Sequence, residues 1–97
     1  MPTVPVRIPL PMRKLTRDAG SVDASGTTVA DLIADLESRY PGIRAKMLDD
    51  DGRLHRYINI YIDGEDIRYR QGLETPVREG EVVQVIPAAA GGSAELA

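Results

Sequence analysis

The sequence contains no cysteine, which excludes disulfide bonds, thiolate metal sites and any mechanism in which the chain supplies its own nucleophilic sulfur. Phenylalanine and tryptophan are also missing, and the 4 aromatic residues are all tyrosines, whose hydroxyl groups need a partner or water. The core must therefore be built from Val, Ile and Leu. A chain of 97 residues has room for one such core, so we expect a single domain.

Recognisable catalytic and metal-binding motifs are missing as well. His55 is the only histidine, and the chain has no glycine-rich phosphate loop. The three aspartates before Gly52 do not form a calcium loop, because aligning Gly52 with the invariant glycine of such a loop puts Met47 and Ile58 at ligand positions. We therefore predict that the protein is not an enzyme, binds no cofactor and holds no metal.

The charge and hydropathy of the chain argue against nucleic acid and membrane as partners. The net charge is −3, whereas binding to phosphates needs a strongly basic face. The small basic cluster of Arg13, Lys14 and Arg17 reads as a solvated loop. No segment approaches the ~20 apolar residues of a membrane span, and prolines interrupt the first twelve residues where a signal peptide would be apolar. We expect a cytoplasmic protein.

The first half of the chain predicts a hairpin and a helix. Apolar residues alternate from Val4 to Leu10, which predicts a strand with one buried face, and residues 21–24 form a short returning strand. Apolar residues then recur at helical spacing from Val29 to Tyr40, with Thr28 placed to cap the helix and a Pro-Gly pair to end it. Residues 43–48 add a short amphipathic turn.

The second half predicts strands. Residues 57–62 alternate between isoleucines and polar or aromatic residues, an Asp-Gly turn leads into a shorter strand at residues 66–69, and residues 82–87 form a final strand with the apolar character of a central position. One helix between two groups of strands can cover one face of a mixed sheet, with the first and last strands parallel at its centre. This is an α+β fold of the β-grasp (ubiquitin-like) type, in which residues 1–87 form the domain and residues 88–97 form a flexible tail.

The tail carries a Gly-Gly pair, Gly91 and Gly92. The pair lies within five residues of Pro87, so an extended tail can hold Gly92 up to about 17 Å from the sheet. Glycine has no Cβ and can thread a narrow channel in another protein, which makes Ala90 and Gly91 the candidate recognition residues of the tail. The tail alone also fits a frayed terminus of small residues.

Five stretches resemble the ubiquitin-like sulfur carriers, the family of MoaD, ThiS and CysO, and in particular the actinobacterial CysO type. They are VRIP at residues 6–9, SVDASG at 21–26, ADLIADLESRYPGI at 30–43, LHRYINIYIDGEDIR at 54–68 and AAAGG at 88–92. The long central stretch together with the Gly-Gly pair is specific to the family.

The resemblance implies that the carboxyl group of Gly92 is the reacting group. In this family an E1-like enzyme of the MoeB/ThiF type uses ATP to adenylate the terminal glycine, and a sulfur donor then converts the adenylate to a thiocarboxylate. A second enzyme, here a CysM-like synthase, accepts the sulfur for the synthesis of cysteine, of a cofactor or of a secondary metabolite, and the CysO likeness favours cysteine over molybdopterin. The carrier is expected to be monomeric when free.

The sequence departs from the family pattern at its end. Many members end at Gly-Gly, whereas residues 93–97 follow here and hold the Gly92 carboxyl in an amide with Ser93. The resemblance therefore implies that this five-residue extension is removed between Gly92 and Ser93, by analogy with members trimmed by a JAMM-type metalloprotease.

A possible partner face lies on the predicted sheet. If the isoleucines of residues 58–62 face the helix, then Tyr57, Asn59 and Tyr61 are turned outward, where we expect them to join Val83 or Val85 in a partner-binding patch. Tyrosine is also a common strand former that needs no partner.

Three other functions fit the same features. The first is a ubiquitin-like protein modifier, which is conjugated through Gly92 to a lysine of another protein. The second is a MoaD-type small subunit of molybdopterin synthase. The third is a β-grasp interaction module that never reacts.

Overall fold

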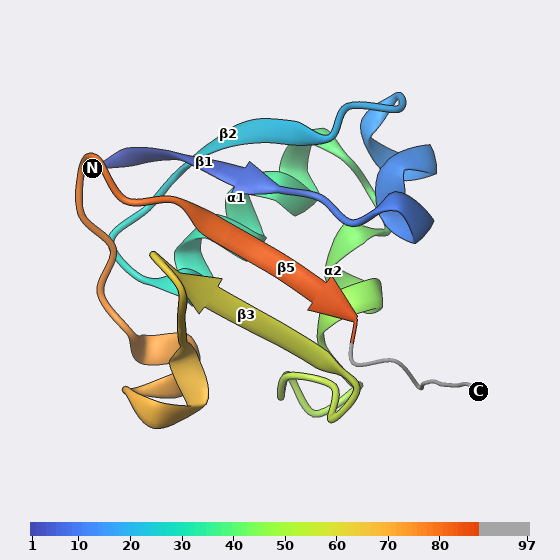
Figure 1. Ribbon diagram of the computed structural model, residues 1–97. Helices are drawn as coiled ribbons and strands as arrows, with labels where there is room; N and C mark the ends of the chain where they lie inside the picture. The colour runs from blue at the N-terminus through green and yellow to red at the C-terminus, as the bar shows by residue number, and fades with distance from the viewer. Residues whose placement is uncertain (88–97) are drawn as a thin grey trace.

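The computed structural model describes residues 1–87, which form a five-stranded mixed sheet with α1 packed across one face (Figure 1). The strands lie in the order β2-β1-β5-β3-β4. β1 and β5 are parallel neighbours at the centre, and the other neighbours are antiparallel. This topology confirms the predicted arrangement of the first and last strands. The predicted tail, residues 88–97, lies outside the described residues.

The N-terminal hairpin is shorter than the alternation of apolar residues predicts. β1 (Thr3–Arg7) pairs with β2 (Ser21–Ser25), but the strand ends before Leu10, whose side chain is 73% exposed. The prediction that Leu10 continues the buried face is wrong. Pro9 and Pro11 cannot donate to a sheet ladder, and proline suits the first turn of a helix, so the chain enters the 3-10 helix η1 (Leu10–Thr16) instead. The basic cluster starts on η1, not in a loop.

α1 (Val29–Arg39) covers the sheet with one apolar stripe, as predicted. Val29, Leu32, Ile33 and Leu36 are buried. Thr28 caps the helix by accepting a hydrogen bond from the Asp31 backbone N–H. The Asp31 carboxylate accepts from the side chain and backbone of Thr27, and these bonds lower its pKa. The Asp31 side chain therefore bonds to Thr27, the residue before the cap.

The short helix α2 (Ile43–Met47) is fixed to α1 by a carboxylate. Glu37 accepts hydrogen bonds from the backbone N–H groups of Arg44, at 2.9 Å, and Gly42. These bonds hold the pKa of Glu37 below its ordinary value, the Arg44 bond contributing most. Ile43 and Met47 are buried, so α2 closes one end of the core as the amphipathic pattern predicts.

The C-terminal half of the sheet is built from three strands. β3 (Ile58–Ile62) pairs along its whole length with β5 (Val83–Pro87) and at one end with the two-residue β4 (Glu65–Asp66). The turn before β4 has positive φ at Asp63 (49°) and Gly64 (89°), as an Asp-Gly hairpin turn requires. The predicted strand at residues 66–69 is wrong beyond Asp66, because the chain turns there into two 3-10 helices, η2 (Ile67–Tyr69) and η3 (Gly72–Glu74).

The core between the sheet and the helices is aliphatic, as the lack of Phe and Trp requires. It contains Val4, Val6 and Ile8 from the first strand and its exit, the three isoleucines of β3, and Val83 and Val85 of β5. Among residues 1–87, none of the helices has both the length and the apolar character that crossing a membrane requires.

Candidate functional site

The carboxyl end of β5 is the point from which the chain leaves the sheet. β5 is the central strand and is paired with β3 up to its last residue, where Pro87 lies opposite Ile58. The tail therefore starts from a position that the sheet holds fixed, next to the beginning of β3. The predicted site residues of the tail, Ala90, Gly91, Gly92 and Ser93, lie outside the described residues.

The face of the sheet that points away from α1, called here the outer face, carries the predicted β3 residues. Asn59 and Tyr61 alternate with the buried isoleucines of β3 and are half-buried on this face. Tyr57 precedes the strand, is 52% exposed and stacks on His55 with the ring centroids 4.9 Å apart. The three residues are thus reachable from solvent, and Asn59 lies opposite Ile86 near the end of β5.

Val83 and Val85 do not belong to the outer face, and this part of the prediction is wrong. Both side chains are 3% exposed and lie in the core. The antiparallel register places Val85 opposite Ile60 and Val83 opposite Ile62, and directly paired residues share a face. The outer face of β5 is instead formed by Gln84 and Ile86.

The sequence did contain a signal for the correct face. Gln84 is the polar residue in an otherwise apolar strand, and residues two apart in a strand point the same way. Placing Gln84 outward puts Ile86 outward with it. Gln84 lies opposite Tyr61 and Ile86 opposite Asn59, so the outer face along β3 and β5 consists of these two pairs and the nearby Tyr57.

Sequence reasoning missed Arg68, which ties η2 to the start of β3. One guanidinium nitrogen of Arg68 donates to the backbone oxygens of His55, at 3.0 Å, and Ile58, at 2.7 Å. The other donates to the side-chain oxygen of Asn59. Since Ile58 and Asn59 pair with the last two residues of β5, Arg68 holds the segment against which β5 ends. No sequence signal links residue 68 to residue 55.

Replacing Arg68 by alanine should lower the free energy of unfolding by about 1 to 2 kcal/mol, because it removes several charge-assisted hydrogen bonds that are partly exposed. Arg70→Ala is the matched control: Arg70 makes one ion pair with Glu65, at 3.6 Å, and surface pairs contribute about 0 to 1 kcal/mol. Urea unfolding of both variants measures the difference. Equal losses would contradict the structural role given to Arg68.

The described residues offer no metal centre. In residues 1–87 no three His, Asp or Glu side chains are grouped so that they could hold an ion. The acidic loop is instead organised by Asp49, which accepts hydrogen bonds from the backbone N–H groups of Arg53 and Asp51. These bonds lower the pKa of Asp49, the Arg53 bond first. His55 contacts the Ala45 carbonyl oxygen at 3.2 Å and stacks on Tyr57, and these contacts give the histidine a structural role.

Comparison with known proteins identifies the family to which the chain is related. The chain matches the ThiS family over residues 6–92. It is 44% identical to the sulfur carrier protein CysO of Mycobacterium tuberculosis over 91 residues, which cover 92% of this chain and 98% of that protein. It is 31% identical to small archaeal modifier protein 3 of Haloferax volcanii over 65 residues, 67% of this chain and 70% of that protein.

A solved structure agrees with the fold. The crystal structure of the Amycolatopsis orientalis BexX/CysO complex contains a chain that superimposes with a TM-score of 0.86 at 44% identity, covering 92% of this chain and 99% of that one. The β-grasp architecture predicted from the sequence is confirmed, and the family match extends across nearly all of the chain up to Gly92. The protein belongs to the ThiS family and has the β-grasp fold of the CysO-type proteins.

Proposed function

We propose that the protein carries activated sulfur on the carboxyl group of Gly92. The observation that supports this most directly is the extent of the family match, which covers residues 6–92 and ends at the second glycine of the Gly-Gly pair. The match to proteins named as sulfur carriers points the same way. The protein acts as a co-substrate of other enzymes and not as a catalyst.

The proposed reaction has two steps. The Gly92 carboxylate first attacks the α-phosphorus of ATP on an E1-like enzyme of the MoeB/ThiF type, which gives an acyl adenylate and releases pyrophosphate. A sulfide equivalent from a sulfur donor then attacks the acyl carbon, AMP leaves, and the carboxylate has exchanged one oxygen for sulfur. ATP and the sulfur donor are bound by partners, and this chain supplies the carboxyl group and its presentation.

The acceptor of the sulfur is, in this proposal, a CysM-like synthase that makes cysteine, and the site of the pathway is the cytoplasm. The relative in the BexX/CysO complex was crystallised with another protein, which supports a function based on partner binding. The outer face along β3 and β5 suits such contacts. Ile86, which is 36% exposed, and the half-exposed Tyr57 provide an apolar centre, and Gln84 and Asn59 provide polar groups at its rim.

A protein modifier is the second candidate, because one relative is named a small archaeal modifier protein. In that case the activated carboxyl of Gly92 would form an amide with a lysine of another protein. A MoaD-type subunit of molybdopterin synthase would carry the same thiocarboxylate to a different acceptor.

Intact-mass measurement of the chain ending at Gly92 separates a sulfur carrier from a protein modifier. The protein is incubated with an E1-like enzyme of its host, ATP and a sulfur donor. Exchange of one oxygen for sulfur supports a carrier, and the new group should react with an alkylating reagent although the chain has no cysteine. A series of covalent adducts would support the modifier instead. An unchanged mass for folded protein with every such enzyme of the host would refute the proposal.

A further inference from the structure

The two edges of β5 are paired to different extents. On the β3 side, pairing continues to Pro87. On the β1 side it ends at Gln84, which lies opposite Arg7, because the chain then turns away into η1. Figure 1 shows the two parallel strands separating at this point. Within the described residues, the backbone from Val85 to Pro87 therefore has no strand partner on this edge.

A groove of about 440 Å³ occupies the space where the strands separate. The last three residues of β5 form one wall, and Ile8, Pro9 and Gly20 contribute to the other. An unpaired strand edge facing a groove can accept an extended segment of another chain as an additional strand. The groove lies on the opposite side of β5 from β3, and it shares Gln84 and Ile86 with the outer face described above.

Two arginines give the groove a positive charge. Arg7 and Arg13 both line it, and no carboxylate of residues 1–87 lies within ion-pair distance of either. Arg13 is held in place: its Nε donates to the Ile8 carbonyl oxygen at 3.0 Å, and its guanidinium lies against Gly20, where an added Cβ would meet it at 3.1 Å. The groove thus contains two positive charges, although the protein as a whole has a net charge of −3.

We propose that this groove, bounded by Val85, Ile86, Arg7 and Arg13, receives an extended acidic segment of the enzyme that activates Gly92. The segment pairs with the free edge of β5, and its carboxylates bind the two guanidinium groups. This inference rests on the proposed function. An enzyme that takes up Gly92 must come within about 17 Å of Pro87, and Pro87 is part of the groove wall.

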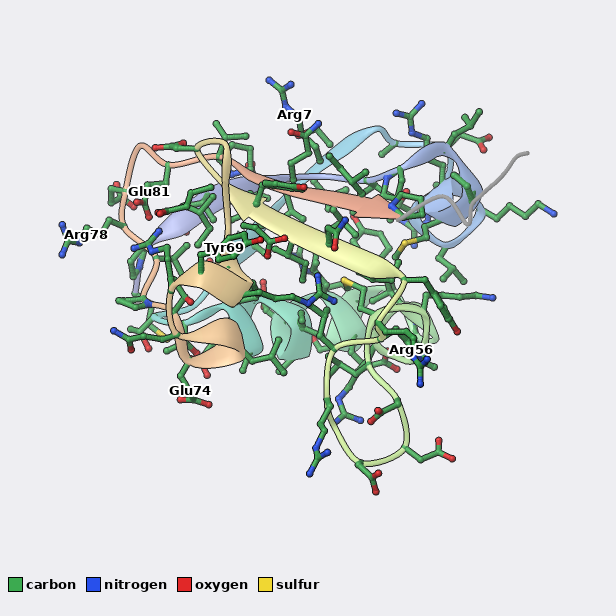
Figure 2. All side chains as sticks on the ribbon, turned by 60° about the horizontal axis from the view of Figure 1, so that its bottom comes forward. Arg7, Arg56, Tyr69, Glu74, Arg78 and Glu81 are labelled. Carbon is green, nitrogen blue, oxygen red and sulfur yellow. The ribbon has the colours of Figure 1, made fainter. Side chains whose placement is uncertain are left out.

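The test measures ATP–pyrophosphate exchange by the E1-like enzyme as the concentration of the chain ending at Gly92 is varied. Arg7→Glu should raise the KM for the carrier about tenfold while kcat stays within about twofold, since a charge at an interface mainly affects association. Arg7→Lys should retain most of the affinity. Arg78→Glu is the matched control, because Figure 2 shows Arg78 at the end of the molecule opposite the arrowhead of β5.

The dependence on salt and a variant at a second residue test the proposal independently. The difference in KM between the wild type and Arg7→Glu should shrink as NaCl is raised, because salt screens exposed charges. Arg13→Glu should behave like Arg7→Glu, with a thermal melt confirming that the protein remains folded. If Arg7→Glu and Arg78→Glu give the same KM, the acidic segment is refuted while the carrier function stands. If the wild-type chain supports no exchange at all, both proposals fail.

Discussion

The chain ending at Gly92 should be loaded with sulfur, and the full 97-residue chain should not be loaded at all. In the full chain the Gly92 carboxyl is part of the amide bond to Ser93 and has no oxygen free to attack ATP. The carboxyl at Ala97 is no substitute, because it lies five residues further along and a misplacement of about 1 Å can already lower a rate about 100-fold. Intact-mass measurement after incubation with the E1-like enzyme, ATP and sulfur donor compares the two chains directly.

Chains ending at Gly91 and at Ser93 are the matched controls. Each ends in a free carboxyl that is displaced from the position of Gly92 by about 3.5 Å of extended chain, and the Ser93 chain also adds a side chain at the terminus. Both should be loaded at least about 100-fold more slowly than the Gly92 chain. Equal loading of the Ser93 chain would show that the enzyme does not select Gly92.

Removal of residues 93–97 should then restore activity to the full chain. The proposed agent is a JAMM-type zinc protease, which should cut between Gly92 and Ser93 and lose its activity when a chelator removes the zinc. Mass spectrometry of the product identifies the cleavage site. Cleavage at another bond, or loading of the full chain without cleavage, would contradict a processing step at this position.

Elements with a strong hydrophobic period were predicted correctly. α1 has its four buried residues at helical spacing, and β3 alternates isoleucines with outward residues, so each element follows from the side chains it carries. The parallel central pair followed from the order of these elements, because one crossover through a helix places the first and last strands together.

The predictions from the sequence failed where local backbone preferences and strand pairing decide the outcome together. The alternation through Leu10 continues past the end of β1, but the prolines on either side of Leu10 favour a helical turn over a sheet edge. In β5 both alternating sets are largely apolar, and the register with β3 decides which set is buried. A single polar residue, Gln84, marks the set that faces solvent.

Arg68 and the groove are beyond prediction from one sequence. The hydrogen bonds of Arg68 connect η2 to backbone oxygens more than nine residues earlier, and an arginine in that position looks like any other surface charge. The groove exists because β1 ends at Arg7, one residue after Val6 pairs with Val83, an outcome of tertiary pairing. Such features become visible only once the strands are placed.

The second large effect concerns the core under the sheet. Replacing Leu36 by alanine should lower the free energy of unfolding by about 3 kcal/mol, because the side chain is 1% exposed and its removal leaves a cavity between α1 and the sheet. Alanine has the higher helix propensity, so the loss cannot come from the helix itself. Ala34→Ser, an exposed change on the same helix, should cost about 0.5 kcal/mol or less. Urea unfolding measures both.

The same variant separates stability from function. Small domains have about 5 to 15 kcal/mol of total stability, so Leu36→Ala should raise the unfolded fraction while leaving most molecules folded at 25 °C. Leu36 lies on the α1 side of the sheet, whereas the outer face lies on the other side and Leu36 does not line the groove. Sulfur loading per folded molecule of the chain ending at Gly92 should therefore stay within about twofold of wild type, since distant sites act independently. A large loss of loading in folded protein would mean that the core, and not only the surface around β5, determines recognition by the activating enzyme.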